Sequence, residues 1–201
     1  MHRFGERWTA GAVLREVLRD RVFYGDGGGV TLTGGEPTMQ PVFAETILRL
    51  ARAAGISTAM ETCGHVAWSV WERLLPHLDQ ILFDVKHLDA VVHRQFTGVG
   101  NELILSNLRQ LIALRAPITI RVPLIPGFNT STESVRALAL FAWEANISSL
   151  DLLPYHTFGK AKYAALNRAY PYEDAPCLTP AELDAISALI TSCGLTVNIG
   201  G

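Results

Sequence analysis

The chain has 201 residues, of which 49% are hydrophobic and 18% charged, a composition that supports one folded domain and excludes a disordered chain. Its 17 basic and 19 acidic side chains nearly balance, so there is no general electrostatic attraction to nucleic acid or to an anionic membrane. No apolar run approaches the ~18 residues that span a bilayer, and residues 1–7 lack the apolar stretch of a signal peptide. We therefore expect a cytoplasmic protein with one domain over residues 1–201.

The cysteines of the chain also favour a reducing compartment such as the cytoplasm. Cys63, Cys177 and Cys193 are odd in number and far apart in sequence, so no disulfide framework is expected. None of their spacings is that of a metal site such as C-x2-C. The sequence therefore predicts a reduced protein and provides no set of cysteine ligands for a metal.

Short apolar and β-branched runs alternate with helical patterns along the chain. The predicted strands cover residues 29–33, 57–61, 80–84, 118–124, 149–153 and 196–199. The predicted helices lie at about 9–22, 43–54, 67–76, 101–115, 131–145 and 180–193. The last helix has the clearest boundaries, because Thr179 and Glu182 fit a capping box and Gly194 follows the helix.

This alternation predicts an α/β fold, a parallel sheet with crossover helices that is either open or bent into a barrel. A closed eight-stranded barrel takes about 250 residues, so six strands in a shorter chain favour a partial (β/α) TIM-type barrel. The chain opens on a predicted helix, whereas a βα series begins with a strand. We therefore expect the first strand of the barrel to be missing.

Polar residues gather where the predicted strands end, and in a parallel α/β fold these carboxyl ends lie at one edge of the sheet. The segments are, in chain order, Gly34-Gly35-Glu36-Pro37, Glu61-Thr62-Cys63-Gly64, Asp84-Val85-Lys86-His87, Arg121 and Pro154-Tyr155-His156. Each has a structural alternative, since glycine pairs form turns, carboxylates cap helices or form ion pairs, and an isolated histidine is usually structural. Their occurrence on five successive strand ends favours a site for a polar ligand.

The chemistry of these residues suggests the kind of ligand. Gly35 allows a strand edge to approach an amino group closely. Lys86 and Arg121 suit a carboxylate, whereas Glu61 and Asp84 suit a cation or an ammonium. Together they fit a zwitterion that resembles an amino acid.

At these positions the chain resembles the glycyl-radical-enzyme activating enzymes of the radical S-adenosylmethionine (SAM) superfamily, which include pyruvate formate-lyase activating enzyme. The matching segments run in the family's order through nearly the whole chain. They are Gly28-Gly29-Val30-Thr31-Leu32-Thr33-Gly34-Gly35-Glu36-Pro37, Glu61-Thr62-Cys63-Gly64, Asp84-Val85-Lys86-His87, Thr97-Gly98-Val99, Arg121-Val122-Pro123-Leu124-Ile125-Pro126-Gly127, Leu152-Leu153-Pro154-Tyr155-His156 and Gly159-Lys160-Ala161-Lys162-Tyr163.

The resemblance implies a role for each matched position. The amino group of SAM would lie against the backbone of Gly34, Gly35 and Glu36. The other implied positions are Asp84, Val85 and Lys86 at the methionine carboxylate and ribose, His156 at the adenosine end, Arg121, Pro37 and Thr62 in the same pocket, and Glu61 with Asp84 at a monovalent cation.

The resemblance also implies an activity and its partners. The family cleaves SAM reductively at a [4Fe-4S] cluster, and the 5′-deoxyadenosyl radical removes a hydrogen from a backbone glycine of a partner glycyl-radical enzyme. Flavodoxin or ferredoxin is the expected type of electron donor.

One departure from the family concerns the cluster. The family holds it with a C-x3-C-x2-C loop after the first strand, and these 201 residues contain no such motif. We therefore expect no catalytic residue and no iron ligand in this chain, which would be the C-terminal portion of a radical SAM core that supplies the SAM-binding part. Two alternatives are a cluster-free pseudoenzyme that binds a glycyl-radical enzyme, and a metal-free barrel enzyme that forms a Schiff base on Lys86.

Overall fold

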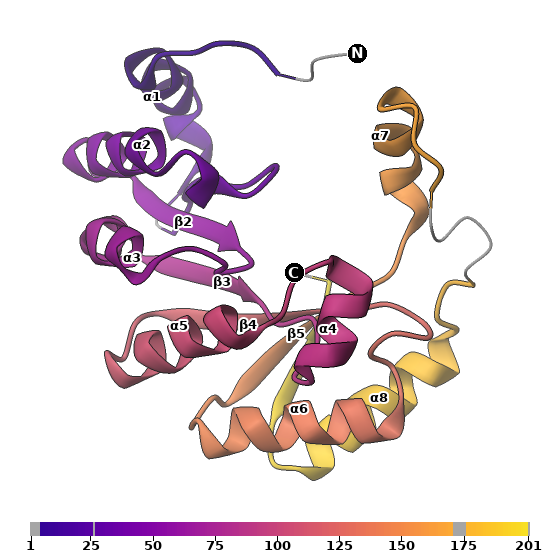
Figure 1. The fold of residues 1–201 in the computed structure, drawn as a ribbon. Helices are drawn as coiled ribbons and strands as arrows, with labels where there is room; N and C mark the ends of the chain where they lie inside the picture. The colour runs from indigo at the N-terminus through magenta and orange to yellow at the C-terminus, as the bar shows by residue number, and fades with distance from the viewer. Residues whose placement is uncertain (1–4, 26, 171–175, 201) are drawn as a thin grey trace. The chain divides into compact units, whose positions relative to one another are not determined.

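The computed structural model describes residues 5–25, 27–170 and 176–200 (Figure 1). The strands are β1 Gly29–Leu32, β2 Ser57–Thr62, β3 Gln80–Asp84, β4 Ile118–Leu124, β5 Ser149–Pro154 and β6 Thr196–Ile199. The α-helices are α1 Ala10–Arg19, α2 Pro41–Ala53, α3 Trp68–Leu74, α4 Ala90–Thr97, α5 Glu102–Ala113, α6 Thr132–Glu144, α7 Lys160–Ala165 and α8 Pro180–Ser192. Four 3-10 turns join them: η1 Arg21–Phe23, η2 Pro37–Met39, η3 Leu75–His77 and η4 Thr157–Gly159.

The strands form one sheet in the order β1-β2-β3-β4-β5-β6, and the pairs β1–β2, β2–β3, β3–β4 and β5–β6 are parallel. The predicted α/β fold with six parallel strands is therefore confirmed. A strand order without reversal is that of a (β/α) barrel, whereas the order of a doubly wound sheet reverses at a switch point. The prediction of helix 9–22 was too long, because α1 ends at Arg19 and the chain continues as a 3-10 turn.

The described residues divide into two compact units, one of residues 8–121 and one that joins residues 5–7 to residues 122–200. In the first unit α2 and α3 lie side by side next to β2 and β3 (Figure 1). The core of this unit contains fully buried Leu48, Met60, Trp71, Phe83 and Leu108. Burial of this apolar surface provides most of the stabilisation of the layers that carry the strand ends.

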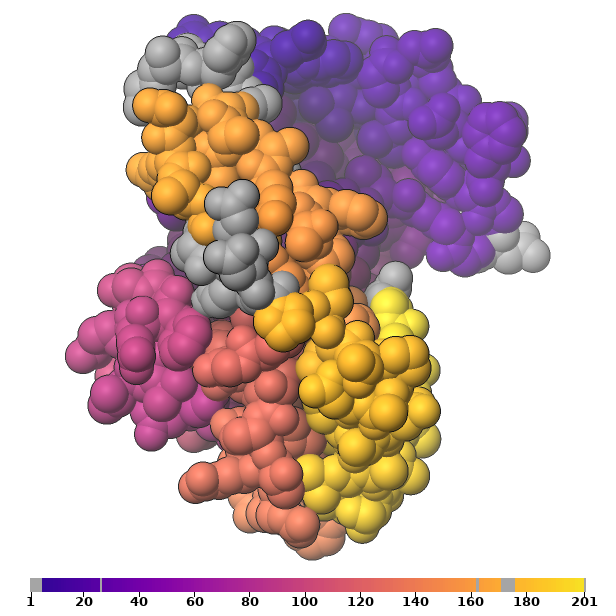
Figure 2. All heavy atoms as spheres, turned by 90° about the vertical axis from the view of Figure 1, so that its right-hand side faces the viewer, coloured from indigo at the N-terminus to yellow at the C-terminus, as the bar shows by residue number. Residues whose placement is uncertain are grey.

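The second unit has its own core. Its α6 and α8 pack side by side, as the space-filling view also shows (Figure 2). Leu124, Ala139, Leu150 and Leu152 are buried there with Ile190. The predicted capping box of α8 is confirmed, because Thr179 accepts from the Glu182 backbone and Glu182 accepts from the Thr179 backbone.

Close contacts in the first unit require glycine at Gly29 and Gly64, among other positions. A Cβ on Gly29 would lie 2.1 Å from the Ser57 carbonyl oxygen, so this glycine lets β1 approach the start of β2. Gly64 has a φ of +72°, and a Cβ there would lie 2.2 Å from the ring of Phe83. The turn after β2 is therefore fixed against the core, which positions the residues at the end of that strand.

None of the helices in the described part of the chain combines the length and the apolar character needed to cross a bilayer.

Candidate functional site

A cavity of about 280 Å³ lies at the carboxyl ends of β1 to β4, entirely within the unit of residues 8–121. Its lining residues are Thr33, Gly34, Gly35, Glu36, Glu61, Thr62, Cys63, Asp84, Lys86 and Arg121. The four strand ends thus bring together eight of the residues proposed from the sequence. Pro37 lies just outside as the first residue of η2, and the Val85 side chain is buried in the core.

The side chain of Arg121 lies between two carboxylates. Its Nη1 is 2.8 Å from Glu61 Oε1, and its Nη2 is 2.9 Å from Asp84 Oδ1. The sheet register explains the second contact, since Arg121 and Asp84 are paired across β4 and β3. Burial lowers the pKa of Arg121, but the hydrogen bonds and charges of Glu61 and Asp84 outweigh this effect and leave it above its ordinary value.

The network continues to both sides of this ion pair. Thr33 Oγ1 donates to Glu61 Oε2 at 2.6 Å, and Lys86 Nζ lies 3.4 Å from Asp84 Oδ2. Burial raises the pKa of Glu61, yet hydrogen bonds from Thr33 and Arg121 and the guanidinium charge bring it below the ordinary value. Glu61 therefore faces the cavity as an anion with a cationic partner, and Asp84 has ion-pair contacts with Arg121 and Lys86.

The contacts of Arg121 bear on the predicted cation site at Glu61 and Asp84. The sequence suggests that Glu61 and Asp84 hold a cation, and in the structure the Arg121 guanidinium supplies positive charge to both of them. The monovalent cation stays a prediction, as does the suggestion that Arg121 binds a ligand carboxylate. Lys86 is the cation at the β3 end of the cavity, where it also contacts Asp84.

The carboxylate of Glu36 accepts hydrogen bonds from protein groups next to the cavity. Its Oε1 accepts hydrogen bonds from Thr38 Oγ1 at 2.7 Å and from Thr62 Oγ1 at 2.8 Å, and its Oε2 accepts from the Cys63 amide at 2.9 Å. Burial raises the pKa of Glu36, but the hydrogen bonds from Cys63, Thr38 and Thr62 bring it below its ordinary value. The backbone of the glycine pair, by contrast, borders open space, because a Cβ on Gly34 or Gly35 would meet no atom within 4 Å.

Two lining residues, Thr33 and Cys63, were not among the proposed site residues. The signal for Thr33 is its place directly before the glycine pair, and the signal for Cys63 is its place directly after Thr62. Burial raises the pKa of the Cys63 thiol, and the nearby Glu36 carboxylate raises it further. The thiol is therefore protonated at neutral pH and is a poor metal ligand in this state.

His156 lies in the other unit, directly after β5. Its Nδ1 accepts from the Phe158 amide at 3.3 Å, and the two rings are 4.5 Å apart. His156 is not among the residues that line the cavity. Its contact with the adenosine end of a ligand therefore stays a prediction.

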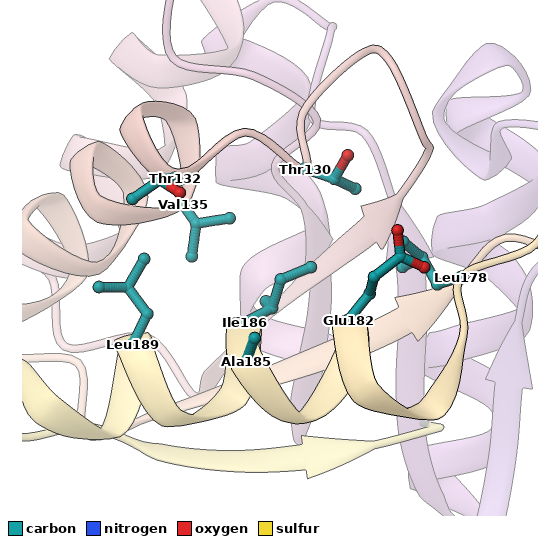
Figure 3. Close-up of a pocket in the computed structure, with 8 residues that line it drawn as sticks. All are labelled: Thr130, Thr132, Val135, Leu178, Glu182, Ala185, Ile186 and Leu189. Carbon is teal, nitrogen blue, oxygen red and sulfur yellow. The ribbon is translucent and has the colours of Figure 1, made fainter.

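The unit of residues 122–200 contains a further pocket, of about 200 Å³, between α6 and α8 (Figure 3). Val135, Ile186 and Leu189 give it an apolar part, Thr130 and Thr132 add hydroxyl groups, and Glu182 lies at one end. The Glu182 carboxylate accepts from Thr179 at 2.7 and 2.8 Å, so it caps α8. We therefore place the candidate site at the ends of β1 to β4, where charged groups converge.

Residues 2–139 of the chain match the Radical SAM superfamily. The chain belongs to this superfamily. It is 41% identical to the choline trimethylamine-lyase activating enzyme of Oleidesulfovibrio alaskensis, over 97% of this chain and 64% of that protein. It is 35% identical to the pyruvate formate-lyase 2-activating enzyme of Escherichia coli, over 99% of this chain and 68% of that protein. Within the superfamily it therefore belongs with the activating enzymes of glycyl-radical enzymes.

A solved structure supports the same assignment. The crystal structure of a domain of pyruvate-formate lyase-activating enzyme from Bacteroides vulgatus is 30% identical to the chain, with a TM-score of 0.73. The match covers 87% of this chain and 100% of that domain. The chain spans about 64% of the length of the choline trimethylamine-lyase activating enzyme.

Radical SAM proteins use SAM and a [4Fe-4S] cluster, and the two groups fit this chain differently. The cavity offers open glycine backbone, an ammonium and several carboxylates, a donor set that suits the methionine part of SAM. Over residues 5–25, 27–170 and 176–200, no three His, Cys, Asp or Glu side chains form a group that could hold a metal ion. The expectation that the cluster ligands are missing from these residues stays a prediction.

Proposed function

We propose that the chain binds SAM in the cavity at the ends of β1 to β4 and is the SAM-binding part of an enzyme that activates a glycyl-radical enzyme. The observation that carries this proposal is the convergence of open glycine backbone with Asp84 and Lys86 in one cavity, in a chain that belongs to the radical SAM superfamily. A zwitterion requires both signs of charge at short range, and the cavity provides both.

Each lining group has a distinct part in this proposal. The backbone at Gly34 and Gly35 receives the amino group of SAM, because glycine carbonyls are accessible there without a side chain in the way. Lys86 binds the methionine carboxylate. Asp84 orients Lys86 and accepts from the ribose hydroxyls, while Arg121 helps to hold the pKa of Glu61 below its ordinary value and forms an ion pair with Asp84.

One-electron reduction of bound SAM would break a sulfonium C–S bond, release methionine and supply the 5′-deoxyadenosyl radical, which would take a hydrogen atom from a backbone glycine of the partner enzyme. The partner proposal rests on the activating enzymes to which the chain is similar. We further propose flavodoxin or ferredoxin as the electron donor and the cytoplasm as the location. The unpaired state of all three cysteines supports a reducing compartment.

The two alternative functions have less support. Lys86 contacts Asp84 at 3.4 Å, an ion pair that engages the amine with which a Schiff base would have to form. A cluster-free pseudoenzyme would share the fold and the cavity, but the similarity to activating enzymes over nearly the whole chain favours the enzyme.

Anaerobic isothermal titration of SAM into the protein tests the proposal. We expect saturable binding with a 1:1 stoichiometry, weakened by about tenfold or more in Lys86→Gln because a charge-assisted hydrogen bond is lost. Arg94→Gln is the matched control, since Arg94 forms an exposed ion pair with Glu102 outside the cavity. Lack of SAM binding by the wild-type protein, or equal binding by Lys86→Gln, would overturn the proposal.

A further inference from the structure

The carboxylate of Glu36 joins two loops that are far apart in sequence. Oε1 accepts from the Thr38 amide at 3.2 Å and the Thr38 hydroxyl at 2.7 Å, within the loop after β1. The same oxygen accepts from Thr62 Oγ1 at 2.8 Å, and Oε2 accepts from the Cys63 amide at 2.9 Å, at the end of β2. Four donors thus meet one carboxylate, and both of its oxygens are engaged.

The β2 side of this junction is anchored in the core. Thr62 Oγ1 also accepts from the Gly64 amide at 2.9 Å, and the Gly64 carbonyl accepts from Asn107 Nδ2 at 2.8 Å. Thr62 and Asn107 are buried, and Gly64 packs against Phe83. The end of β2 is therefore a rigid support.

On the β1 side, Thr33 Oγ1 donates to Glu61 just before the glycine pair, but the pair itself borders open space. Gly34 has a φ of +112°, and side chains built on Gly34 or Gly35 would meet nothing within 4 Å. Glycine loses more backbone freedom on folding than any other residue, so two consecutive glycines in open space need an external restraint. Glu36 is the next residue, and its carboxylate connects this glycine pair to the rigid end of β2.

We propose that Glu36 is a positioning residue, whose carboxylate clamps the β1 loop to Thr62 and Cys63 and thereby holds the Gly34–Gly35 backbone in the shape that receives the amino group of the ligand. This inference rests on the proposed SAM site, but the clamp itself is a property of the protein alone. Because both carboxylate oxygens are occupied by the framework, Glu36 acts through the backbone of its neighbours and not by contacting the ligand with its side chain.

The Cys63 thiol reports on this clamp. Burial and the Glu36 carboxylate together raise the pKa of the thiol, whereas the His65 backbone and the charge of Lys86 lower it. Replacing the carboxylate by a neutral amide removes the raising charge and leaves the Lys86 charge in place. Since the thiolate is the reactive species, alkylation of Cys63 should become faster and its pH profile should move to lower pH.

The test compares the wild-type protein with Glu36→Gln in a Cys177→Ser/Cys193→Ser background, which leaves Cys63 as the one thiol of the sequence. Three quantities are measured: the iodoacetamide alkylation rate of Cys63 against pH, the hydrogen exchange of the Gly34, Gly35 and Cys63 amides, and SAM binding by titration. In Glu36→Gln we expect alkylation at least about threefold faster at neutral pH, at least about tenfold faster amide exchange and SAM binding weakened by about tenfold. Glu102→Gln, a matched change in an exposed ion pair, should leave all three unchanged.

The outcomes separate this inference from the proposed function. If the wild-type protein does not bind SAM but Glu36→Gln speeds alkylation and glycine exchange, the proposed function fails and the clamp stands. If the wild-type protein binds SAM and Glu36→Gln binds it equally well with unchanged exchange at Gly34 and Gly35, the inference is wrong and the proposed function stands. Should Glu36→Gln not fold, Thr62→Val removes one donor of the clamp and should change exchange at the glycine pair in the same direction; unchanged exchange there overturns the inference.

Discussion

Arg121 and Glu61 form an ion pair that passes over a strand. Arg121 belongs to β4 and Glu61 to β2, and β3 lies between them in the sheet, yet Arg121 Nη1 is 2.8 Å from Glu61 Oε1. The same guanidinium contacts Asp84 at the end of the intervening strand. One side chain therefore ties together three neighbouring strands at the wall of the cavity.

Removal of this guanidinium should destabilise the protein. Breaking a fully buried ion pair costs roughly 3–5 kcal/mol, and because these carboxylates are partly exposed we expect Arg121→Gln to lower the free energy of unfolding by about 2 kcal/mol. Urea unfolding at pH 7 measures this. Arg94→Gln removes an exposed pair and should cost at most about 0.5 kcal/mol. Equal losses in the two variants would contradict the tie between strand ends.

The lowered carboxyl pKa values predict a pH dependence of stability. The pKa values of Glu36 and Glu61 in the folded protein lie below the ordinary value of 4.5, so both carboxylates contribute their full stabilisation above that pH. The contribution is lost as the pH falls through the folded-state values. We expect the urea midpoint to fall between pH 5 and pH 3, and to fall less steeply in Glu36→Gln. An unchanged slope in that variant would show that Glu36 gains nothing from its four donors.

Gly64 should be intolerant of a side chain. In Gly64→Ala the new methyl group would meet the Phe83 ring at 2.2 Å and the residue would keep a φ of +72°, so we expect a loss of about 3 kcal/mol. Gly98→Ala separates the two causes. Gly98 has a φ of +86°, but a methyl group there would meet no atom within 4 Å, so its replacement should cost only about 1 kcal/mol. Similar losses, measured by thermal unfolding, would assign the effect to the backbone alone.

Gly35→Ala distinguishes stability from binding. A methyl group on Gly35 meets no protein atom within 4 Å, so the unfolding free energy should change by less than about 0.5 kcal/mol. The methyl group would occupy the space where the proposed amino group approaches, and SAM binding should weaken by about tenfold or more. Titration and urea unfolding of the same preparation measure both. Unaltered binding would show that this backbone does not receive the ligand.

Much of the fold could be predicted from the sequence because its strands are short apolar runs with sharp ends. All six strands end within one residue of the predicted position. The helix α4 was missed because His93 is its one buried residue, so no apolar stripe marks it. Its ends do carry a signal, since Asp89 caps the Val91 and Val92 amides and Gly98 ends the helix with a left-handed conformation.

The clustering of the residues around the cavity was predictable to a similar extent and for a related reason. Parallel strands present their carboxyl ends at one edge, so residues after β1, β2 and β3 could be grouped without knowledge of any contact. The side-chain pairing could not be derived in this way. Arg121 reaches Glu61 across β3, and Glu36 reaches Thr62 and Cys63, contacts that depend on register and rotamer rather than on spacing in the chain.

The charged side chains around the cavity also determine its electrostatic attraction for a ligand. Three carboxylates, those of Glu36, Glu61 and Asp84, and two cations, Lys86 and Arg121, line it, which leaves one excess negative charge. SAM carries one net positive charge through its sulfonium, so the overall attraction is favourable but small. At physiological ionic strength this field extends only about 8 Å, and addition of salt should therefore weaken the proposed binding of SAM only slightly.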